Sequence, residues 1–323
     1  MDAQGTVREN FIRAIDRRRP AHVPLVVPDQ PEISDGVMAV TLPAAGFTPA
    51  KEGATEWGFA WKRLDETVGQ PEKPVLADWA TVADFAPPDP DAPGRFEQLD
   101  AMRAEYPDRY ALLSLGVSGF TLMSLLIGFE ELLEGVLTGE PRVYDLADLV
   151  FGFEEGIIRG AAAHGAGAVC FYDDWGTQHG TIIAPTLWRD VFKPRYVRQF
   201  ALAHELGMHV DFHSCGNVYA LIDELIDSGA DMLNLNQPRL FGIERLAADF
   251  GRRVCFLCPV DIQRVLLDGT QDEIRAEARL LIESLGKPDG GFVALVEPFY
   301  AKLAASPDNI DTAIAAFREF GRY

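Results

Sequence analysis

The chain has 323 residues, of which 48% are hydrophobic, and it carries a formal net charge of −20 from 49 acidic and 29 basic residues. This length and composition predict a large buried core, while the acidity argues against nucleic acid or an anionic membrane as a partner. No run of about 18 apolar residues occurs, and the charged start of the chain lacks the apolar stretch of a signal peptide. We therefore expect a cytoplasmic protein, monomeric or homodimeric, with its four cysteines as free thiols.

The amino-terminal third predicts a helix, a buried strand and an irregular region. Apolar residues at helical spacing indicate an amphipathic helix over 6–19, and a short apolar run indicates a buried strand over 22–28. A weaker strand candidate follows at 37–42. Residues 43–94 are rich in proline and tryptophan and predict a hairpin and loop insertion over one end of the fold, with a strand-like piece at 56–64.

From residue 95 onward, strand-like and helix-like segments alternate. Strands are predicted at 110–117, 168–172, 209–213, 231–235, 254–258 and 292–296. Helices are predicted at 96–106, 122–137, 141–164, 185–207, 218–228, 242–250, 271–285 and 307–320. Strands separated by helices indicate a parallel sheet, and eight strands favour a single α/β domain over 1–323, a (β/α)8 TIM-type barrel. The first strand is not followed by a glycine-rich phosphate-binding motif, which argues against a dinucleotide-binding fold.

A His-x-Cys pair at the end of one predicted strand is the most informative motif. Side chains alternate along a strand, so His213 and Cys215 lie on one face and can converge on one zinc ion. Two residues do not close a zinc site. Cys258, which ends another strand before a proline, is the expected third ligand, and Glu297 after the last strand is a further candidate. The alternative is a buried histidine with inert thiols.

Other residues of these strands are expected to have supporting roles. Cys255 lies three residues before Cys258, on the opposite strand face, which predicts packing against the helices. Cys170 lies in the middle of a strand and is expected in the core. Asp211 shares a face with His213, where it either fixes the imidazole in one tautomer or is a buried carboxylate inside the barrel.

Further polar residues follow the strand ends, where TIM barrels place their active sites. Asp173 and Asp174 are candidate catalytic groups, as a general base or a substrate contact, and their alternative role is helix capping and loop hydrogen bonding. His179 in the same loop is a candidate proton carrier. The candidate substrate-binding residues are Trp175, Gln178, Asn236 and Asp261, of which Asn236 is also a candidate fourth ligand.

Three segments resemble the uroporphyrinogen decarboxylase superfamily, in particular its methyltransferase-like branches. They are FYDDWGTQHGTIIAPTLWRDVFKPRYVR at 171–198, HSCGNVYALIDELIDSGADMLNLNQ at 213–237 and FLCPVDIQ at 256–263. The resemblance covers residues 100–323 well and implies one of two activities. The metal-free decarboxylases of this superfamily bind a multi-carboxylate tetrapyrrole through an arginine-bearing amino-terminal loop, and the matching region 27–33 contains no arginine.

The superfamily's zinc methyltransferases transfer a methyl group from a corrinoid protein to a thiol, and they carry a His-x-Cys pair as at His213 and Cys215. The resemblance therefore implies a zinc-dependent methyltransferase whose methylcobamide is carried by a corrinoid-binding partner protein. The methyl acceptor would be a small molecule such as coenzyme M, homocysteine or a pterin. Their third ligand is a cysteine on the last strand, where this chain has Glu297, so Cys258 or Glu297 has to replace it. A metal-free decarboxylase is the alternative.

Overall fold

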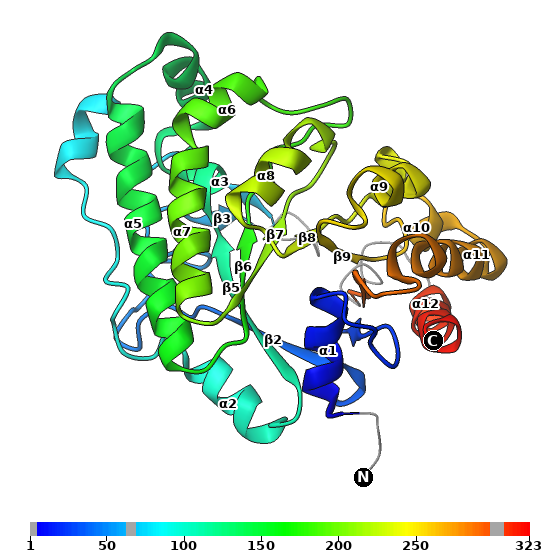
Figure 1. The fold of residues 1–323 in the computed structure, drawn as a ribbon. Helices are drawn as coiled ribbons and strands as arrows, with labels where there is room; N and C mark the ends of the chain where they lie inside the picture. Colours follow the sequence, from blue (N-terminus) through cyan, green and yellow to red (C-terminus); the bar gives the residue numbers. More distant parts are fainter. Residues whose placement is uncertain (1–4, 63–68, 298–306) are drawn as a thin grey trace.

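The computed structural model describes residues 5–62, 69–297 and 307–323, so positions 63 and 64 of the strand-like piece expected at 56–64 lie outside the described residues. The barrel strands are β1 (Leu25–Val26), β2 (Gly36–Val40), β5 (Tyr110–Val117), β6 (Ala168–Tyr172), β7 (His209–His213), β8 (Met232–Asn234), β9 (Cys255–Cys258) and β10 (Phe292–Leu295). They form one eight-stranded sheet in the order β1-β10-β9-β8-β7-β6-β5-β2, with every described pair parallel. This nearly closed cylinder confirms the predicted (β/α)8 barrel (Figure 1).

Helices surround the cylinder on its outside. Long helices follow β5 and β6 on one side, where α5 packs against α7, and α11 packs against α12 on another side (Figure 1). The helices after the first are α2 (Glu97–Glu105), α3 (Gly119–Ile127), α4 (Phe129–Thr138), α5 (Arg142–Ala163), α6 (Pro185–Val191), α7 (Lys193–Glu205), α8 (Ile222–Ser228), α9 (Ile243–Phe250), α10 (Val265–Asp268), α11 (Gln271–Leu281) and α12 (Pro307–Phe320). Short helical turns are η1 (Pro31–Ile33), η2 (Trp79–Asp84), η3 (Tyr219–Leu221), η4 (Pro238–Leu240) and the π-helical turn η5 (Ile282–Gly286). None of the described helices has both the length and the apolar composition needed to span a bilayer.

The first helix, α1 (Val7–Ile15), closes the barrel at the end where the strands begin. Thr6 and Glu9 form a capping box that starts it. Phe11 projects into the barrel interior and stacks on Tyr110 at 4.6 Å between ring centroids. The helix ends at Ile15, before the predicted residue 19, because the backbone turns away through positive φ angles at the arginines that follow.

The barrel closes between β1 and β2 through side chains as well as backbone. No α-helix separates these strands, and one backbone hydrogen bond joins them, from Asp35 N to Leu25 O at 2.7 Å. The Asp35 carboxylate accepts from Leu25 N at 2.8 Å, and Ser34 Oγ accepts from Val27 N at 2.9 Å. The side chains of Ser34 and Asp35 thus bind backbone N–H groups of the β1 segment that the backbone of a longer paired strand would bind.

Two of the predicted helices are each broken into two. The helix expected over 122–137 divides at Gly128, whose φ of 101° is left-handed and ends α3. The helix expected over 185–207 divides after Val191, and α7 begins with Pro194 in its first turn. Proline lacks an N–H and is tolerated only in that turn, so a continuous helix would have been strained there.

The region 43–94 contains the predicted hairpin. Strands β3 (Trp61–Lys62) and β4 (Gln70–Pro71) pair in an antiparallel manner. An ion pair fixes the region to the barrel side, since the almost fully buried Arg95 contacts Glu56 at 2.8 Å. A buried, hydrogen-bonded pair of this kind orders the chain around it.

Candidate metal centre

The imidazole of His213 is held in one orientation at the carboxyl end of β7. Its Nδ1 lies 3.2 Å from Oδ1 of Asn234, its register partner on β8. An amide oxygen only accepts hydrogen bonds, so this contact places the proton on Nδ1 and leaves the Nε2 lone pair free. The Tyr172 ring packs on the imidazole at 4.8 Å between centroids. His213 therefore presents the nitrogen of a metal-binding tautomer.

The free Nε2 faces a thiol and a carboxylate. Cys215 Sγ lies 3.4 Å from it, and Oδ1 of Asp174 lies 3.6 Å from it. The backbone N–H of Cys215 donates to the same Asp174 oxygen at 2.8 Å, which ties the two loops together. The ligand atoms of these three residues all lie within 4.8 Å of one another. The sequence predicted His213 and Cys215 as neighbours, and the structure adds Asp174 to them.

Two spacings in this group are close to those of a zinc site. Zinc bonds of about 2.0–2.1 Å to nitrogen and oxygen and about 2.3 Å to sulfur place neighbouring ligand atoms about 3.3–3.6 Å apart. Nε2 of His213 lies 3.4 Å from the Cys215 sulfur and 3.6 Å from the Asp174 oxygen, within a few tenths of an ångström of these values. One imidazole, one thiol and one carboxylate also form a donor set that zinc accepts, with the fourth position left for a substrate.

The charges around Cys215 favour a cation. Burial raises the pKa of its thiol, and the negative charges of Asp174 and Glu297 raise that pKa further. Glu297 therefore lies within electrostatic reach of the thiol, at the end of β10, although it is not one of the three closely grouped residues. A divalent cation would reverse this effect and stabilise the thiolate.

Cys258 is not brought to this group. Met232, Cys255 and Leu257 line the barrel interior, so Cys258 points outward into the core between the sheet and the helices. It is fully buried there, and burial raises its pKa to about 12. This placement corrects two expectations. Cys258 was expected to be the third metal ligand and Cys255 to pack against the helices, but Cys255 faces the barrel interior and Cys258 faces the helices. Side chains alternate between the two faces of a strand, and pairing with the neighbouring strands decides which of the two sets faces the interior.

Asp211 lies one pleat below His213, inside the barrel. It is fully buried, and neither carboxylate oxygen has a hydrogen-bond partner of normal geometry in the part of the chain that is described. Burial raises its pKa to about 6, while the His213 charge, the Cys170 thiol and the Asn234 amide lower it. Cys170 is in the interior core, as expected. Asp211 therefore interacts with His213 through charge, and no hydrogen bond between the two side chains is present among the described contacts.

Asp173 is occupied by structural contacts. It is fully buried and accepts hydrogen bonds from the backbone N–H groups of Phe120 and Thr121, from Thr121 Oγ1 and from the Tyr196 hydroxyl. These donors lie at the start of α3 and on α7, so the carboxylate joins both helices to β6. Burial raises its pKa to about 6, against the lowering effect of the donors. A Cβ on Gly119 would lie 2.1 Å from this carboxylate, which accounts for the glycine.

The loops after β6 and β7 support each other closely. Ser214 Oγ accepts from Trp175 N at 2.8 Å, and Gln237 Oε1 accepts from Gly216 N at 3.0 Å. Gly176 and Gly216 pack backbone against backbone, since a Cβ on either would lie within 2.5 Å of the other loop. No local sequence pattern predicts these contacts, because their partners are distant along the chain.

The remaining candidates are spread over different environments. Trp175 is fully buried against aromatic rings and donates to Tyr196, so it is not open to a ligand, which corrects its expected substrate contact. Asp261 is also buried, and its carboxylate accepts from the N–H groups of Gln263 and Arg264. Asn236 is buried after β8. Gln178 and His179 are exposed on the loop after β6 and remain candidates.

A further buried acid, Glu154 on α5, predicts a pH-dependent stability. It accepts from Gly119 N at 2.7 Å and from Gln199 Nε2 at 2.7 Å, and burial raises its pKa from 4.5 to about 8. Between these pH values the folded state binds the proton more tightly than the unfolded state, so stability is greatest below the range and falls as the pH rises. We expect a loss of up to about 1.4 kcal/mol per pH unit from this group.

Denaturant unfolding at pH 6.5, 7.2 and 8.0 would measure this loss. The Glu154→Gln variant cannot titrate, so the difference between wild type and variant isolates the group from Asp173 and Asp211, whose raised values near 6 act at lower pH. A wild-type stability that rises over this range relative to the variant would contradict the prediction.

A parallel eight-stranded barrel with a histidine, a cysteine and an aspartate gathered at its carboxyl end defines a TIM-barrel protein with a candidate metal centre. The family model for uroporphyrinogen decarboxylase (URO-D) matches residues 58–319, which is more than half of the chain. The chain therefore belongs to the URO-D family. Membership of this family supports an enzymatic activity.

One solved structure has the same fold over nearly the whole chain. The structure is similar to a methyltransferase from Methanosarcina mazei, with a TM-score of 0.71 and 16% identity over 98% of this chain and 99% of that chain. Weaker likenesses are the GH18 chitinase ChiB of Flavobacterium johnsoniae (TM-score 0.43, 8% identity, 93% and 95% of the two chains) and a D-psicose 3-epimerase from Clostridium cellulolyticum H10 (0.42, 9%, 75% and 86%). No curated protein matches the sequence.

Proposed function

We propose that this protein is a zinc-dependent methyltransferase that moves a methyl group from a corrinoid, carried by a partner protein, to a small thiol. The observation that carries the proposal is the group of His213, Cys215 and Asp174 at the carboxyl end of the barrel. The URO-D family and the fold shared with a Methanosarcina methyltransferase support it.

The chemistry follows from the donor set. Zinc would bind the acceptor thiol in its open position and lower the pKa of that thiol, so that it reacts as a thiolate. Cys215 and Asp174 would supply two negative charges between them, the same total as the two thiolates of the expected ligand set. Asn234 keeps the proton of His213 on Nδ1, and Asp174 fixes the loop of Cys215 through its backbone N–H. These residues would hold the zinc ion, and their negative charges would keep the sulfur of a bound thiolate electron-rich.

The third protein ligand would be Asp174, with Glu297 as the competing residue. We expect Asp174→Ala to weaken zinc binding by about 100-fold, because a direct ligand is lost. We expect Glu297→Gln to weaken it by less than about tenfold, because only a nearby charge is lost. Competition with a chromophoric zinc chelator would measure both affinities. The reverse order of the two effects would assign the ligand to Glu297 and contradict the assignment to Asp174.

The alternative function within the family is that of a metal-free decarboxylase. The region after the first strand, 27–33, contains no arginine that could bind a multi-carboxylate tetrapyrrole. The overall charge of −20 also disfavours a polyanionic substrate at the barrel mouth. These two facts give the methyltransferase the stronger support.

Free methylcobalamin provides a direct assay. Purified protein would be incubated with methylcobalamin and coenzyme M, homocysteine or tetrahydrofolate, and loss of the methyl–cobalt bond would be followed by visible absorption. We expect demethylation that requires a thiol, stops after removal of zinc by a chelator and returns when zinc is added. Demethylation with tetrahydrofolate alone would replace the thiol by a pterin as acceptor. A protein that holds no zinc and demethylates with none of the three would overturn the proposal.

A further inference from the structure

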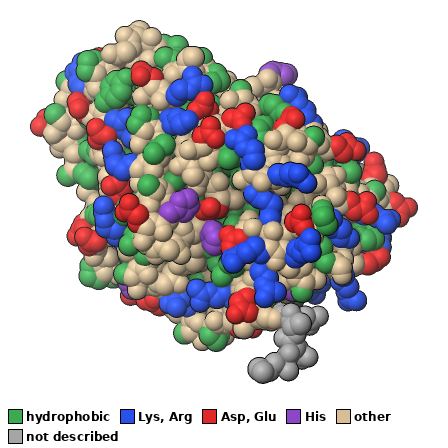
Figure 2. Space-filling model, in the orientation of Figure 1, with side chains coloured by type: hydrophobic (Ala, Val, Ile, Leu, Met, Phe, Trp, Pro, Cys, Tyr) green, Lys and Arg blue, Asp and Glu red, His purple; other side chains and the backbone are tan. Residues whose placement is uncertain are grey.

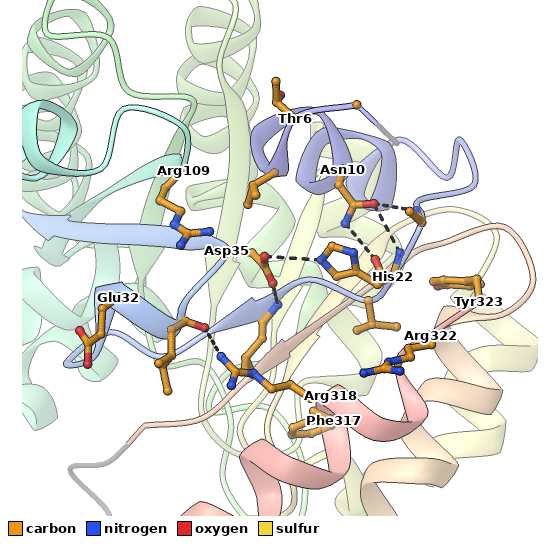
Figure 3. Close-up of a pocket in the computed structure, with 17 residues that line it drawn as sticks. Thr6, Asn10, His22, Glu32, Asp35, Arg109, Phe317, Arg318, Arg322 and Tyr323 are labelled. Atoms are coloured by element: carbon orange, nitrogen blue, oxygen red, sulfur yellow. Dashed lines mark hydrogen bonds and ion pairs between the residues drawn. The ribbon is translucent and has the colours of Figure 1, made fainter. Parts of the chain in front are cut away.

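A second pocket lies at the opposite end of the barrel from the metal centre. Its volume is about 810 Å³, and it is lined by α1, by the residues that precede β1, β2 and β5, and by the end of α12 (Figure 3). His22, Asp35 and Arg109 are three such residues before strands, which fixes the pocket at the amino-terminal end of the sheet. Pockets of roughly 300–1,000 Å³ are the size that holds small molecules.

Three arginines from two sides of the molecule line this pocket. Arg109 comes from the start of β5, and its Nε is buried without a hydrogen-bond partner, with the Asp108 carboxylate no closer than 3.9 Å. Arg318 on α12 donates only to the Ile33 carbonyl among the described contacts. Arg318 and Arg322 are exposed at the rim of the pocket, and Arg322 makes no ion pair with any residue that the structure describes. Figure 3 shows the side chains of Arg109, Arg318 and Arg322 at the same pocket.

Of these three arginines, Arg109 has one long ion pair, with Asp108 at 3.9 Å, while Arg318 and Arg322 have none among the described residues. In Figure 2 the surface around α1 carries Lys and Arg side chains interspersed with Asp and Glu side chains. The pocket has two acids of its own. Asp35 is engaged by Leu25 N at 2.8 Å and His22 Nε2 at 3.4 Å, and Glu32 is exposed. Asp108, the ion-pair partner of Arg109, is outside the lining, so the lining itself holds three guanidinium groups and two carboxylates.

The other walls of the pocket contain both apolar and polar side chains. Leu25 and Phe317 are buried residues that contribute to them. Asn10 holds the segment around His22 by donating to the His22 carbonyl at 3.0 Å and accepting from Ala21 N at 2.6 Å. A rigid wall of this kind reduces the entropic cost of binding.

We propose that this pocket binds a small organic anion with at least two acidic groups, which are carboxylates or phosphates. Arg109 reaches one acidic group from the barrel, and Arg318 with Arg322 reach the other from the carboxyl-terminal helix. Guanidinium groups bind carboxylates and phosphates through paired hydrogen bonds of fixed geometry, which matches their unpaired N–H groups here. The apolar side chains between them contact the carbon body of the ligand.

Isothermal titration of the full-length protein in low-salt buffer tests this site, with citrate as the carboxylate probe and inorganic pyrophosphate as the phosphate probe. We expect saturable binding of one probe, which identifies the acid type, and an increase in Kd of about tenfold in both Arg109→Gln and Arg322→Gln. Arg252 is exposed and in no described ion pair, so Arg252→Gln is the matched control and should leave Kd within about twofold of wild type.

Two further measurements make the result decisive. Unfolding midpoints without ligand should agree between wild type and the arginine variants, which shows that weaker binding does not come from misfolding. Cys215→Ala should bind the probe as wild type does, because the two sites lie at opposite ends of the barrel. If neither probe binds saturably at millimolar concentration, or if Arg252→Gln weakens binding as much as the pocket variants, the proposal is overturned.

Discussion

The Cys215→Ala variant is expected to lose its zinc, from about one ion per chain to less than about a tenth, when purified without chelator. Cys215 supplies the only thiol within 4.8 Å of both Nε2 of His213 and Oδ1 of Asp174 among the described residues. An imidazole and one carboxylate bind zinc far more weakly than a set that includes a thiolate. Elemental analysis after extensive dialysis measures the loss directly, and demethylation of methylcobalamin should fall with it.

The matched control for this experiment is Cys258→Ala. It also removes one thiol, but from the core outside the barrel wall, where it should cost about 1 kcal/mol of stability and leave the zinc content unchanged. Loss of zinc from Cys258→Ala, with retention in Cys215→Ala, would contradict the arrangement of the site. Loss of zinc from both variants would show that each substitution disturbs the fold, and it would contradict a direct role for Cys215 as a ligand.

The Asp173→Ala variant is expected to be about 3–5 kcal/mol less stable than wild type. The substitution leaves four donors in the buried interior without an acceptor, namely two backbone N–H groups, the Thr121 hydroxyl and the Tyr196 hydroxyl. Each such group carries a desolvation cost of roughly 1–3 kcal/mol, and relaxation around the site recovers part of the sum. Denaturant unfolding followed by circular dichroism measures the difference.

The neighbouring residue provides the contrast. Asp174 is half exposed, so in metal-free protein Asp174→Ala should change the free energy of unfolding by less than about 1 kcal/mol, although it weakens zinc binding. Asp173→Asn keeps one acceptor oxygen and should fall between wild type and Asp173→Ala. If Asp173→Ala were as stable as wild type but inactive, the residue would have the catalytic role expected from the sequence.

The barrel could be predicted because its signal is repeated along the chain. Apolar runs of strand length alternate with helical spacing from residue 110 to the end, and parallel strands with intervening helices have few possible arrangements. The helix breaks at Gly128 and before Pro194 carried a local signal, in the form of the two residue types that interrupt helices. The end of α1 at Ile15 was not predictable, because it depends on positive φ angles at Arg17 and Arg19, a conformation that arginine rarely adopts.

The candidate site could be predicted only in part. His213 and Cys215 lie two residues apart on one strand, so their proximity follows from strand geometry alone. Asp174 comes from another loop, and a neighbouring aspartate offered the same chemistry, so the sequence could not say which of the two faces the imidazole. Cys258 was misplaced because a four-residue buried strand shows no polar alternation that would set its inward face.

The joint between β1 and β2 has a consequence for association between molecules. A sheet that opened there would expose two unpaired strand edges, which are templates for pairing with another chain. Ser34 and Asp35 occupy the backbone groups of Leu25 and Val27 that would otherwise be available for such pairing. These two short side chains therefore protect the protein from edge-to-edge aggregation as well as completing the cylinder.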